Sequence, residues 1–380
     1  MKNTLRSLDS TAILVVILGV GVLLSTRLEA GQINFDKRLL PTSVEYHYSF
    51  STPGGQVHQL NFQLDRNLTE TSKGLFTKSG KQQLNRRASQ QAEDIYNSLQ
   101  AVYIERARDE FNAYIEKQVR LLPDGIKIQN QGKGENIRAS SDGSMPQEQA
   151  NQVIDHFFAT MNSKWQELNT QYLAEFDQEV TSQTQKNYID IYGQHYYVAS
   201  FTNSSAKDFS LRVDFDRVAR LQVLALKPVA DAIARNTHGL PMRKVLNYAA
   251  YYIQSIPYDT LNSRSAHDST GFVAPLTLFD INRGDCDTKA TALAAIIRNL
   301  YPQLEIKMIL IPNHAFLALQ IPGEEGDSAI IYAKREFVLL EAAGPSLTPV
   351  GKSYESSLEH MQANPEKIGR MLPMLADSTG

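Results

Sequence analysis

Two long stretches of helical periodicity place the strongest constraint on how this 380-residue chain folds. The first runs from about Ala88 to Leu122 and the second from about Pro146 to Val180. In both, apolar residues recur three or four positions apart, which is the spacing of one helix face. The first stripe contains Ile95, Leu99, Val102, Phe111, Ile115 and Leu122, and the second contains Ile154, Phe157, Phe158, Met161, Trp165, Leu168, Tyr172 and Phe176. We expect an antiparallel helical hairpin over residues 88–180. Its aromatic stripes form a core in one interpretation and a docking surface for a partner protein in the other.

Strand patterns flank this hairpin. Residues 44–50 and 60–64 alternate apolar and polar side chains around the turn Pro53-Gly54-Gly55, which predicts a β-hairpin. The glycine-rich stretch 126–143 between the two helices predicts a second, small hairpin. Residues 186–226 are rich in tyrosine, valine and isoleucine and are expected to return to strand. The chain is therefore predicted to be an α+β protein.

Charge and cysteine content exclude several classes of protein. Lysine and arginine total 38 against 41 aspartates and glutamates, a net charge of −3, so the chain lacks the basic field of a nucleic-acid binder. A single cysteine excludes an intrachain disulfide framework and a cysteine-based metal cluster. That residue is either a small buried hydrophobe or a reactive thiol.

The N-terminus has the pattern of an export signal. Lys2 and Arg6 precede an uncharged apolar run over residues 12–24. We expect residues 1–30 to be either a cleaved signal peptide or an N-terminal anchor that holds the protein to the inner membrane through residues 11–26. In both cases the body of the protein is exported and periplasmic.

The cysteine lies where a helix is expected to begin. Cys286 follows Arg283-Gly284-Asp285, and the residues after it have apolar side chains at the spacing of one helix face. The unpaired amides and the positive end of a helix N-terminus favour an anion, which here is the thiolate. The flanking Asp285 and Asp287 are most simply helix caps. Cys286 is therefore a candidate nucleophile.

Two further residues complete a candidate catalytic triad. His314 begins a predicted strand over residues 313–319, and Glu341 ends another over residues 337–341. A thiol nucleophile needs a base that takes its proton and an acid that orients the base. Cys286, His314 and Glu341 have the side chains for these three roles.

The sequence GDCDTKATALAAIIRNL, then NHAFLAL, then FVLLEAAGP, resembles the transglutaminase-like superfamily in its bacterial cysteine-peptidase-like branch. The upstream segments YYIQSIPYD and GFVAPLTLFDINR resemble those that precede the family's cysteine, so the resemblance covers about residues 238–350. It implies a papain-like domain in which the helix that carries the cysteine packs on an antiparallel sheet. The family's catalytic groups are a Cys, a His and usually an Asp. The matching residues are Cys286, His314 and Glu341, so glutamate replaces the usual aspartate.

These observations predict four segments: the targeting segment 1–30, an N-terminal α+β domain over 31–225 that contains the helical hairpin, a transglutaminase-like domain over 226–350, and a C-terminal tail over 351–380. The expected function is thiol acyl transfer, with hydrolysis of a peptide or isopeptide bond in an exported protein or peptide substrate. The alternatives are a non-catalytic binding or scaffold protein and a cross-linking transamidase. The helical hairpin is a candidate docking site for a partner.

The resemblance requires no cofactor, although some relatives bind calcium beside the cysteine. Asp285 and Asp287 are the candidate calcium ligands. In the expected reaction, the Cys286 amide stabilises the oxyanion together with a second donor, for which Gln254 and Asn282 are candidates.

Overall fold

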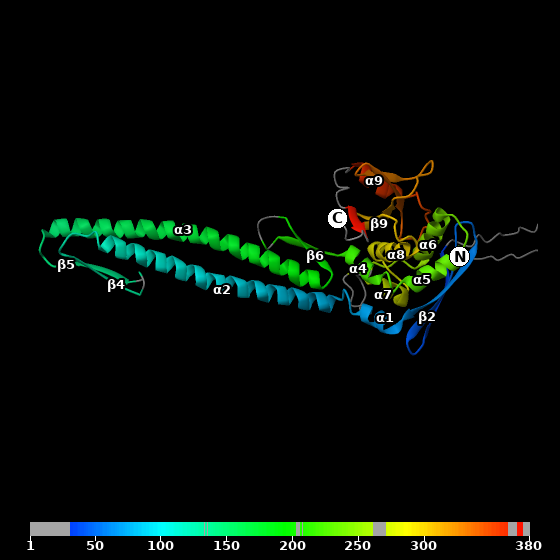
Figure 1. Cartoon of the computed structure of the whole chain (residues 1–380), viewed down its shortest axis with the longest axis horizontal. Coiled ribbons are helices and arrows are strands. Elements are labelled where there is room, and N and C mark those ends of the chain that lie inside the picture. The colour runs from blue at the N-terminus through cyan, green and yellow to red at the C-terminus, as the bar shows by residue number, and fades with distance from the viewer. Residues whose placement is uncertain are drawn as a thin grey trace, which may run out of the picture.

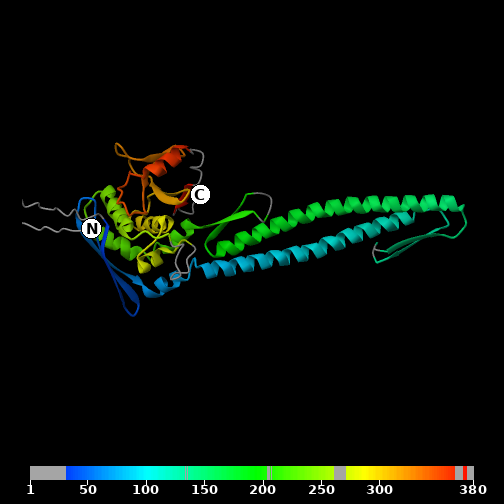
Figure 2. The same cartoon turned by 180° about the vertical axis from the view of Figure 1, so that it is seen from behind.

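A computed structural model describes residues 31–132, 134, 136–202, 206, 208–260, 271–363 and 371–374 of the chain. A long helical hairpin projects from a body in which helices pack on antiparallel sheets (Figures 1 and 2). This mixed architecture agrees with the expected α+β class. The apolar run over residues 12–24 lies outside the described residues. Among the helices that the structure does describe, none is long and apolar enough to cross a bilayer.

The projecting arm is the helical hairpin predicted from the sequence. It consists of α2 (Lys78–Val119) and α3 (Gln147–Gln194), which run side by side in opposite directions. The short strands β4 (Ile126–Gln131) and β5 (Asn136–Ser141) pair between them, as expected for the glycine-rich stretch. With 48 residues, α3 is about 70 Å long at 1.5 Å per residue.

Away from the body, the hairpin buries one narrow seam between its helices, because two helices without a third partner bury one stripe each. The seam contains Ala107, Phe111, Ile115, Phe157, Met161, Leu168 and Tyr172. Other members of the expected stripes lie outside it: Val102 is 51% exposed, Phe158 37% and Trp165 38%. The stripes therefore form a core along this seam and leave apolar residues exposed beside it.

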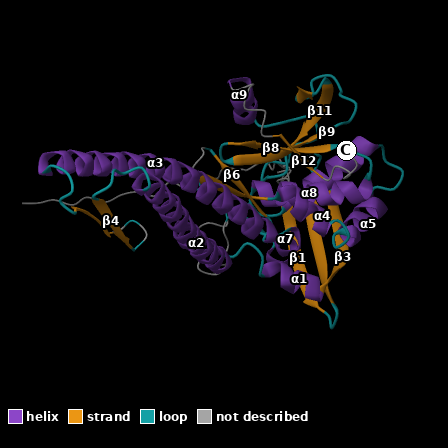
Figure 3. Cartoon of the chain, turned by 60° about the vertical axis from the view of Figure 1, so that its left-hand side comes forward, coloured by secondary structure: helices purple, strands orange, loops and turns teal. Residues whose placement is uncertain are grey.

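A three-stranded antiparallel sheet forms one wall of the body. Its strands are β1 (Gly31–Leu39), β2 (Ser43–Ser51) and β3 (Val57–Asp65), in that order. The pairing of β2 with β3 confirms the predicted β-hairpin. β1 was not predicted, because few of its side chains are apolar. Figure 3 shows this sheet beside α1 (Arg66–Lys73) and α7 (Pro275–Ile281).

The buried side chains of this sheet share one core with helices from the C-terminal half. These helices are α5 (Lys227–Asn236), α6 (Met242–Ser255), α7 and α8 (Cys286–Leu300). Tyr48 of β2, for example, lies edge-on to Tyr252 of α6 with ring centroids 5.1 Å apart. The N-terminal sheet therefore supports the helix that carries the cysteine.

The expected return to strand at residue 186 is wrong in its first part. α3 continues to Gln194, and strands appear only at β6 (Tyr197–Phe201) and β7 (Phe209–Val213), followed by α4 (Phe215–Gln222). Tyr188, Ile191 and Tyr192 have β-favouring side chains, but their spacing of three and four continues the helical period. Ile191 and Tyr192 are buried, so packing prevails over local propensity.

The C-terminal half contains a five-stranded antiparallel sheet with the order β10-β11-β9-β8-β12. Its strands are β8 (Ile306–Ile311), β9 (His314–Leu319), β10 (Ala329–Tyr332), β11 (Arg335–Leu340) and β12 (Met371–Met374). Met308 and Leu317 face the core that contains α8, whereas Ile309 and Phe316 pack in a second cluster with Met361 of α9 (Glu355–Ala363). Both faces are covered, which explains why these strands read as continuous apolar runs. Both α9 and β12 belong to the segment 351–380, which we had expected to be a tail.

Candidate active site

Cys286 occupies the first position of α8, as the sequence predicts. Asp285 is the N-cap, and its carboxylate accepts a hydrogen bond from the Thr288 amide at 3.2 Å. The Asp287 carboxylate accepts from the same amide at 2.9 Å. Both aspartates therefore satisfy the open amides of the first turn, which is the simplest role expected for them.

The thiol of Cys286 lies in a polar but poorly hydrated environment. The backbone amides of Ala315 and Asp287 near the sulfur favour the thiolate. Burial opposes this, and the carboxylates of Asp287 and Asp285 oppose it further, so the pKa of Cys286 is raised to about 12. The amide at the helix start favours the thiolate, as expected, but burial and the two neighbouring carboxylates outweigh it.

His314 and Glu341 are in direct contact. The Nε2 atom of His314 lies 2.8 Å from the Oε2 atom of Glu341, whose side chain is fully buried. The second carboxylate oxygen accepts hydrogen bonds from the Ser353 hydroxyl at 2.5 Å and the Tyr354 amide at 3.3 Å. The ring centroids of Phe316 and Tyr354 lie 5.5 and 5.7 Å from that of the imidazole. Because Nε2 contacts the carboxylate, Nδ1 is the ring nitrogen left for the thiol proton.

A cavity of 580 Å³ opens onto both Cys286 and His314. The Ala315 amide near the sulfur belongs to the residue that follows His314, so the start of β9 lies beside the thiol. Glu341 follows β11, which pairs with β9, and it contacts the imidazole from inside the protein. The structure therefore places Cys286 and His314 on one cavity, with Glu341 against the imidazole.

The two residues that we considered as the second oxyanion donor have other positions. The Gln254 side-chain amide donates to the carbonyls of Glu341 and Thr348 at 2.8 and 2.9 Å, and its oxygen accepts from the Thr348 amide. It is buried and supports the segment that carries Glu341. Asn282 ends α7 in the left-handed conformation, with φ of 50°, and does not line the cavity. Neither residue fits the role.

Tyr258 is a site residue whose role the sequence did not reveal. Tyr258 lines the same cavity as Cys286, and its hydroxyl lies close enough to the thiol for the two groups to affect each other's ionisation. Burial, followed by the charges around Cys286, raises the pKa of Tyr258 to about 12, so the hydroxyl keeps its proton. An isolated β-bridge to Gly284 fixes Tyr258 beside the loop that leads to the thiol. Its place in the segment IPYD, which resembles the family, was the only available signal.

Lys289 is a second residue that the sequence did not single out. It is fully buried in α8, and its ammonium donates hydrogen bonds to the carbonyls of Ile256 and Ala343, each at 2.5 Å. The Ile256 carbonyl is two residues before Tyr258, and the Ala343 carbonyl is two residues after Glu341. The Lys289 side chain therefore joins the two segments that carry these residues by hydrogen bonds. Burial lowers the pKa of Lys289 to about 7. A lysine within an apolar helix face was the sequence signal.

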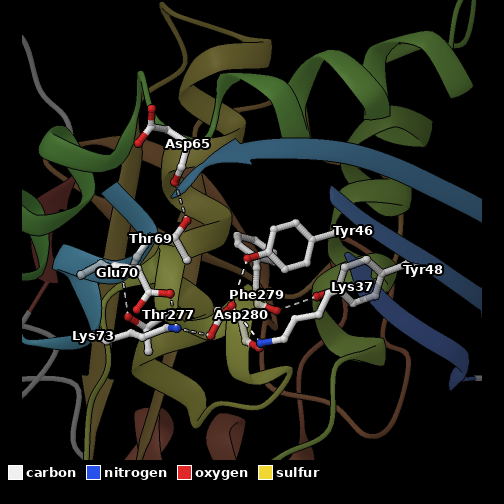
Figure 4. Close-up of polar contacts among 11 residues, drawn as sticks. Lys37, Tyr46, Tyr48, Asp65, Thr69, Glu70, Lys73, Thr277, Phe279 and Asp280 are labelled. Carbon is white, nitrogen blue, oxygen red and sulfur yellow. Dashed lines mark hydrogen bonds and ion pairs between the residues drawn. The ribbon is translucent and has the colours of Figure 1, made fainter. Parts of the chain in front are cut away.

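A buried carboxylate joins the N-terminal sheet to the approach to Cys286. Figure 4 shows Lys37 of β1 and Lys73 of α1 converging on Asp280 of α7, each at 2.9 Å, with the Tyr46 hydroxyl 3.3 Å away. Burial by itself raises the pKa of Asp280, but the hydrogen bonds and charges of the two lysines hold it below its usual value. This cluster fixes α7 six residues before Cys286.

Asp285 and Asp287 do not form a calcium site by themselves. Calcium takes six to eight oxygen ligands, and the described part of the chain contains no group of three or more His, Cys, Asp or Glu side chains placed to hold a metal ion. Burial and the adjacent Asp287 raise the pKa of Asp285, and burial raises that of Asp287. The two carboxyls share a hydrogen bond with each other, which favours a shared proton at this site.

No family model matches this chain, and no curated protein or solved structure matches it either.

Proposed function

We propose that this chain is an exported thiol acyl-transfer enzyme with a papain-like, transglutaminase-like domain, and that it hydrolyses a peptide or isopeptide bond. Cys286 is the nucleophile, His314 the base and Glu341 the residue that orients the base. The observation that carries the proposal is the contact of 2.8 Å between His314 and a fully buried Glu341, in a cavity that also exposes the thiol. A buried carboxylate behind a histidine beside a cysteine is the arrangement that thiol catalysis requires.

The reaction begins with proton transfer from the Cys286 thiol to Nδ1 of His314 as the sulfur attacks the carbonyl carbon. A C–S bond forms, and the carbonyl oxygen becomes an oxyanion that accepts hydrogen bonds from the Cys286 amide and the Tyr258 hydroxyl. The C–N bond then breaks, and His314 gives its proton to the departing amine. Water attacks the thioester, His314 takes a proton from it, and the C–S bond breaks to release a carboxylic acid and restore the thiol.

The raised thiol pKa assigns His314 a necessary part in this scheme. A thiol with a pKa of about 12 is almost fully protonated at neutral pH. The reaction therefore depends on proton transfer during the attack rather than on a preformed thiolate. Glu341 stabilises the imidazolium that forms, because its charge lies against Nε2.

The test is a comparison of exported proteins between a strain that carries Cys286→Ala and the wild type. The expected result is one or more exported proteins that stay unprocessed in the variant strain and in a Glu341→Gln strain. A strain with Lys227→Gln, a surface lysine of α5 paired with Asp231, is the control. Unchanged processing together with full activity of purified Cys286→Ala would reject the enzyme proposal.

The high pKa of the thiol also favours a second candidate, a non-catalytic binding protein in which the cavity holds a ligand without covalent chemistry. The strain comparison separates the two, because binding survives Cys286→Ala. A third activity, transamidation, differs from hydrolysis only in the second nucleophile. Supplying primary amines with a glutamine peptide distinguishes these two reactions, since only a transamidase incorporates the amine.

A further inference from the structure

The cavity at Cys286 has walls from two distant parts of the chain. One wall comes from the C-terminal half and carries Cys286 and His314. Other lining residues come from the first turn of α2 and from β7 near the base of the helical hairpin: Lys81 and Arg212 line the same 580 Å³ cavity. Two cationic side chains therefore face the space in which the reacting bond must lie.

Neither cation forms an ion pair at contact distance with a carboxylate among the residues that the structure describes. The Arg212 guanidinium donates to the Val213 carbonyl at 3.3 Å, and no described carboxylate lies within ion-pair distance of it. The nearby Asp214 accepts a hydrogen bond from the Arg217 amide at 3.2 Å and caps α4. The Lys81 ammonium lies 5.8 Å from the ring centroid of Tyr197, and the described residues place no carboxylate against it.

The acidic residues of the cavity are already engaged. Asp285 and Asp287 line it, but both accept from the Thr288 amide and hydrogen-bond to each other at the start of α8. Burial lowers the pKa of Arg212, because a half-buried guanidinium loses hydration, and the charge of Asp214 offsets this loss only in part. A ligand with an anionic group would supply the missing charge.

We propose that the site accepts acyl donors that carry a carboxylate near the reacting carbonyl, and that Arg212 and Lys81 bind this carboxylate. Arg212 has the planar fork that fits a carboxylate with two hydrogen bonds, and Lys81 adds a point charge. The inference rests on the proposed function, since it names the substrate class of the same site. It also gives the base of the helical hairpin a role in specificity.

The test compares alkylation of Cys286 by iodoacetate and by iodoacetamide, which have nearly the same shape and differ in charge. Because the chain has one cysteine, the mass of the intact protein reports Cys286 alone. The ratio of the two rate constants cancels the thiolate fraction, so a change in thiol pKa does not affect it. We expect the ratio to fall about three- to tenfold in Arg212→Gln and in Lys81→Gln, and to fall with added salt in the wild type.

Lys227→Gln and Arg235→Gln, which change exposed cations of α5, are the matched controls and should leave the ratio unchanged. An unchanged ratio in both Arg212→Gln and Lys81→Gln, with wild-type melting temperatures, overturns the inference. This outcome is distinct from failure of the proposed function, because alkylation needs no turnover and the function is tested by Cys286→Ala.

A second measurement identifies the source of the carboxylate. The measurement compares how well three short peptides protect Cys286 from iodoacetamide by occupying the cavity. One has an internal glutamate and an amidated C-terminus, and another has an internal glutamine and a free C-terminal carboxylate. The third has an internal glutamine and an amidated C-terminus. Stronger protection by either one than by the amidated glutamine peptide supports the inference and names a side-chain or a terminal carboxylate as the ligand. Equal protection by all three peptides, or by none, contradicts it.

Discussion

The reactivity of Cys286 toward iodoacetamide tests the electrostatics of the site most directly. Burial first, and then the charges of Asp287 and Asp285, raise the thiol pKa to about 12 from a reference of 9.0. That difference corresponds to about 4 kcal/mol against the thiolate. At pH 8 about one molecule in 10⁴ then carries a thiolate, whereas about one in four free cysteines does. The greater nucleophilicity of a high-pKa thiolate recovers part of the difference, because rates rise with pKa with a slope of about 0.4–0.5.

We therefore expect Cys286 to react about 10- to 100-fold more slowly than free cysteine at pH 8. Its rate should rise about tenfold per pH unit from pH 7 to 10 without a plateau. Replacing both Asp285 and Asp287 by asparagine removes the charge that the pair carries with its shared proton and keeps residues that cap a helix well. If the thiol pKa falls by about one pH unit, the rate at pH 8 rises about threefold. Each single replacement should have a smaller effect, because the remaining carboxyl loses the shared proton and stays ionised.

The assay is the mass of the intact protein after timed alkylation, and Asp231→Asn, a change in a surface carboxylate of α5, is the control. An alkylation rate of the wild type that already stops rising with pH below pH 6 would refute the reasoning. It would show that Cys286 and His314 already form a thiolate–imidazolium pair. An unchanged rate in the double variant would show that the carboxylates do not contribute and that burial alone raises the pKa.

Three other perturbations test the supports of the site. Glu341→Gln should abolish the acceptor that holds the Nε2–H tautomer of His314 and lower turnover about 10²–10⁴-fold; nitrogen NMR of the imidazole detects the tautomer without a substrate. Asp280→Asn should lower the free energy of unfolding by about 2–3 kcal/mol at pH 7, since its lysine partners are about one-third exposed. The pKa of Asp280 is lowered on folding, so its contribution to the free energy of unfolding is present above the pKa of the unfolded chain and is lost as the pH falls through the pKa of the folded protein. Urea titrations of the wild type and the variant should therefore converge at low pH. The pKa of Lys289 is also lowered on folding, to about 7 from 10.5, so the unfolded chain binds more protons than the folded chain between these pH values. The free energy of unfolding should therefore rise from pH 7 to about 10, by at most about 1.4 kcal/mol per pH unit. Lys289→Met should remove this rise.

Each of these predictions has a contradicting result. An Nε2–H tautomer that persists in Glu341→Gln would mean that another group orients the imidazole. Equal urea midpoints for Asp280→Asn and wild type at pH 7 would mean that the buried cluster of Figure 4 contributes no net stability. A pH dependence that is the same with and without Lys289 would place the titrating group elsewhere.

Patterns that depend on neighbouring residues were predictable from the sequence. The periods of three and four residues identified the hairpin of α2 and α3, and alternation identified β2 and β3. The start of α8 at Cys286 and the start of β9 at His314 followed from caps and apolar runs in the same way. At Tyr188 two local signals conflicted: the composition suggested a strand, whereas the spacing of apolar residues suggested a helix. The segment is helical because the residues that follow Tyr188 at this spacing are buried.

Features that depend on distant residues were not predictable from the sequence. β1 has too few apolar side chains to signal a strand. It is a strand because it pairs with β2, which the sequence of β1 alone does not reveal. Gln254 was considered as an oxyanion donor from its place near the resembling segment, but its actual partners, Glu341 and Thr348, lie far along the chain. The hydroxyl that shares the cavity with the thiol belongs to Tyr258.

The sequence by itself determined the elements, the order of thiol, imidazole and carboxylate, and the position of Cys286 at a helix start, because each of these depends on residues within a few turns of chain. Only the tertiary structure decided the chemical state of the thiol and the charge of the cavity around it. The pKa of Cys286 depends on burial by the whole body, and the cations Lys81 and Arg212 reach the cavity only because the base of the hairpin packs there. Solvation and charge act through space, so they follow from the fold and not from the order of residues along the chain.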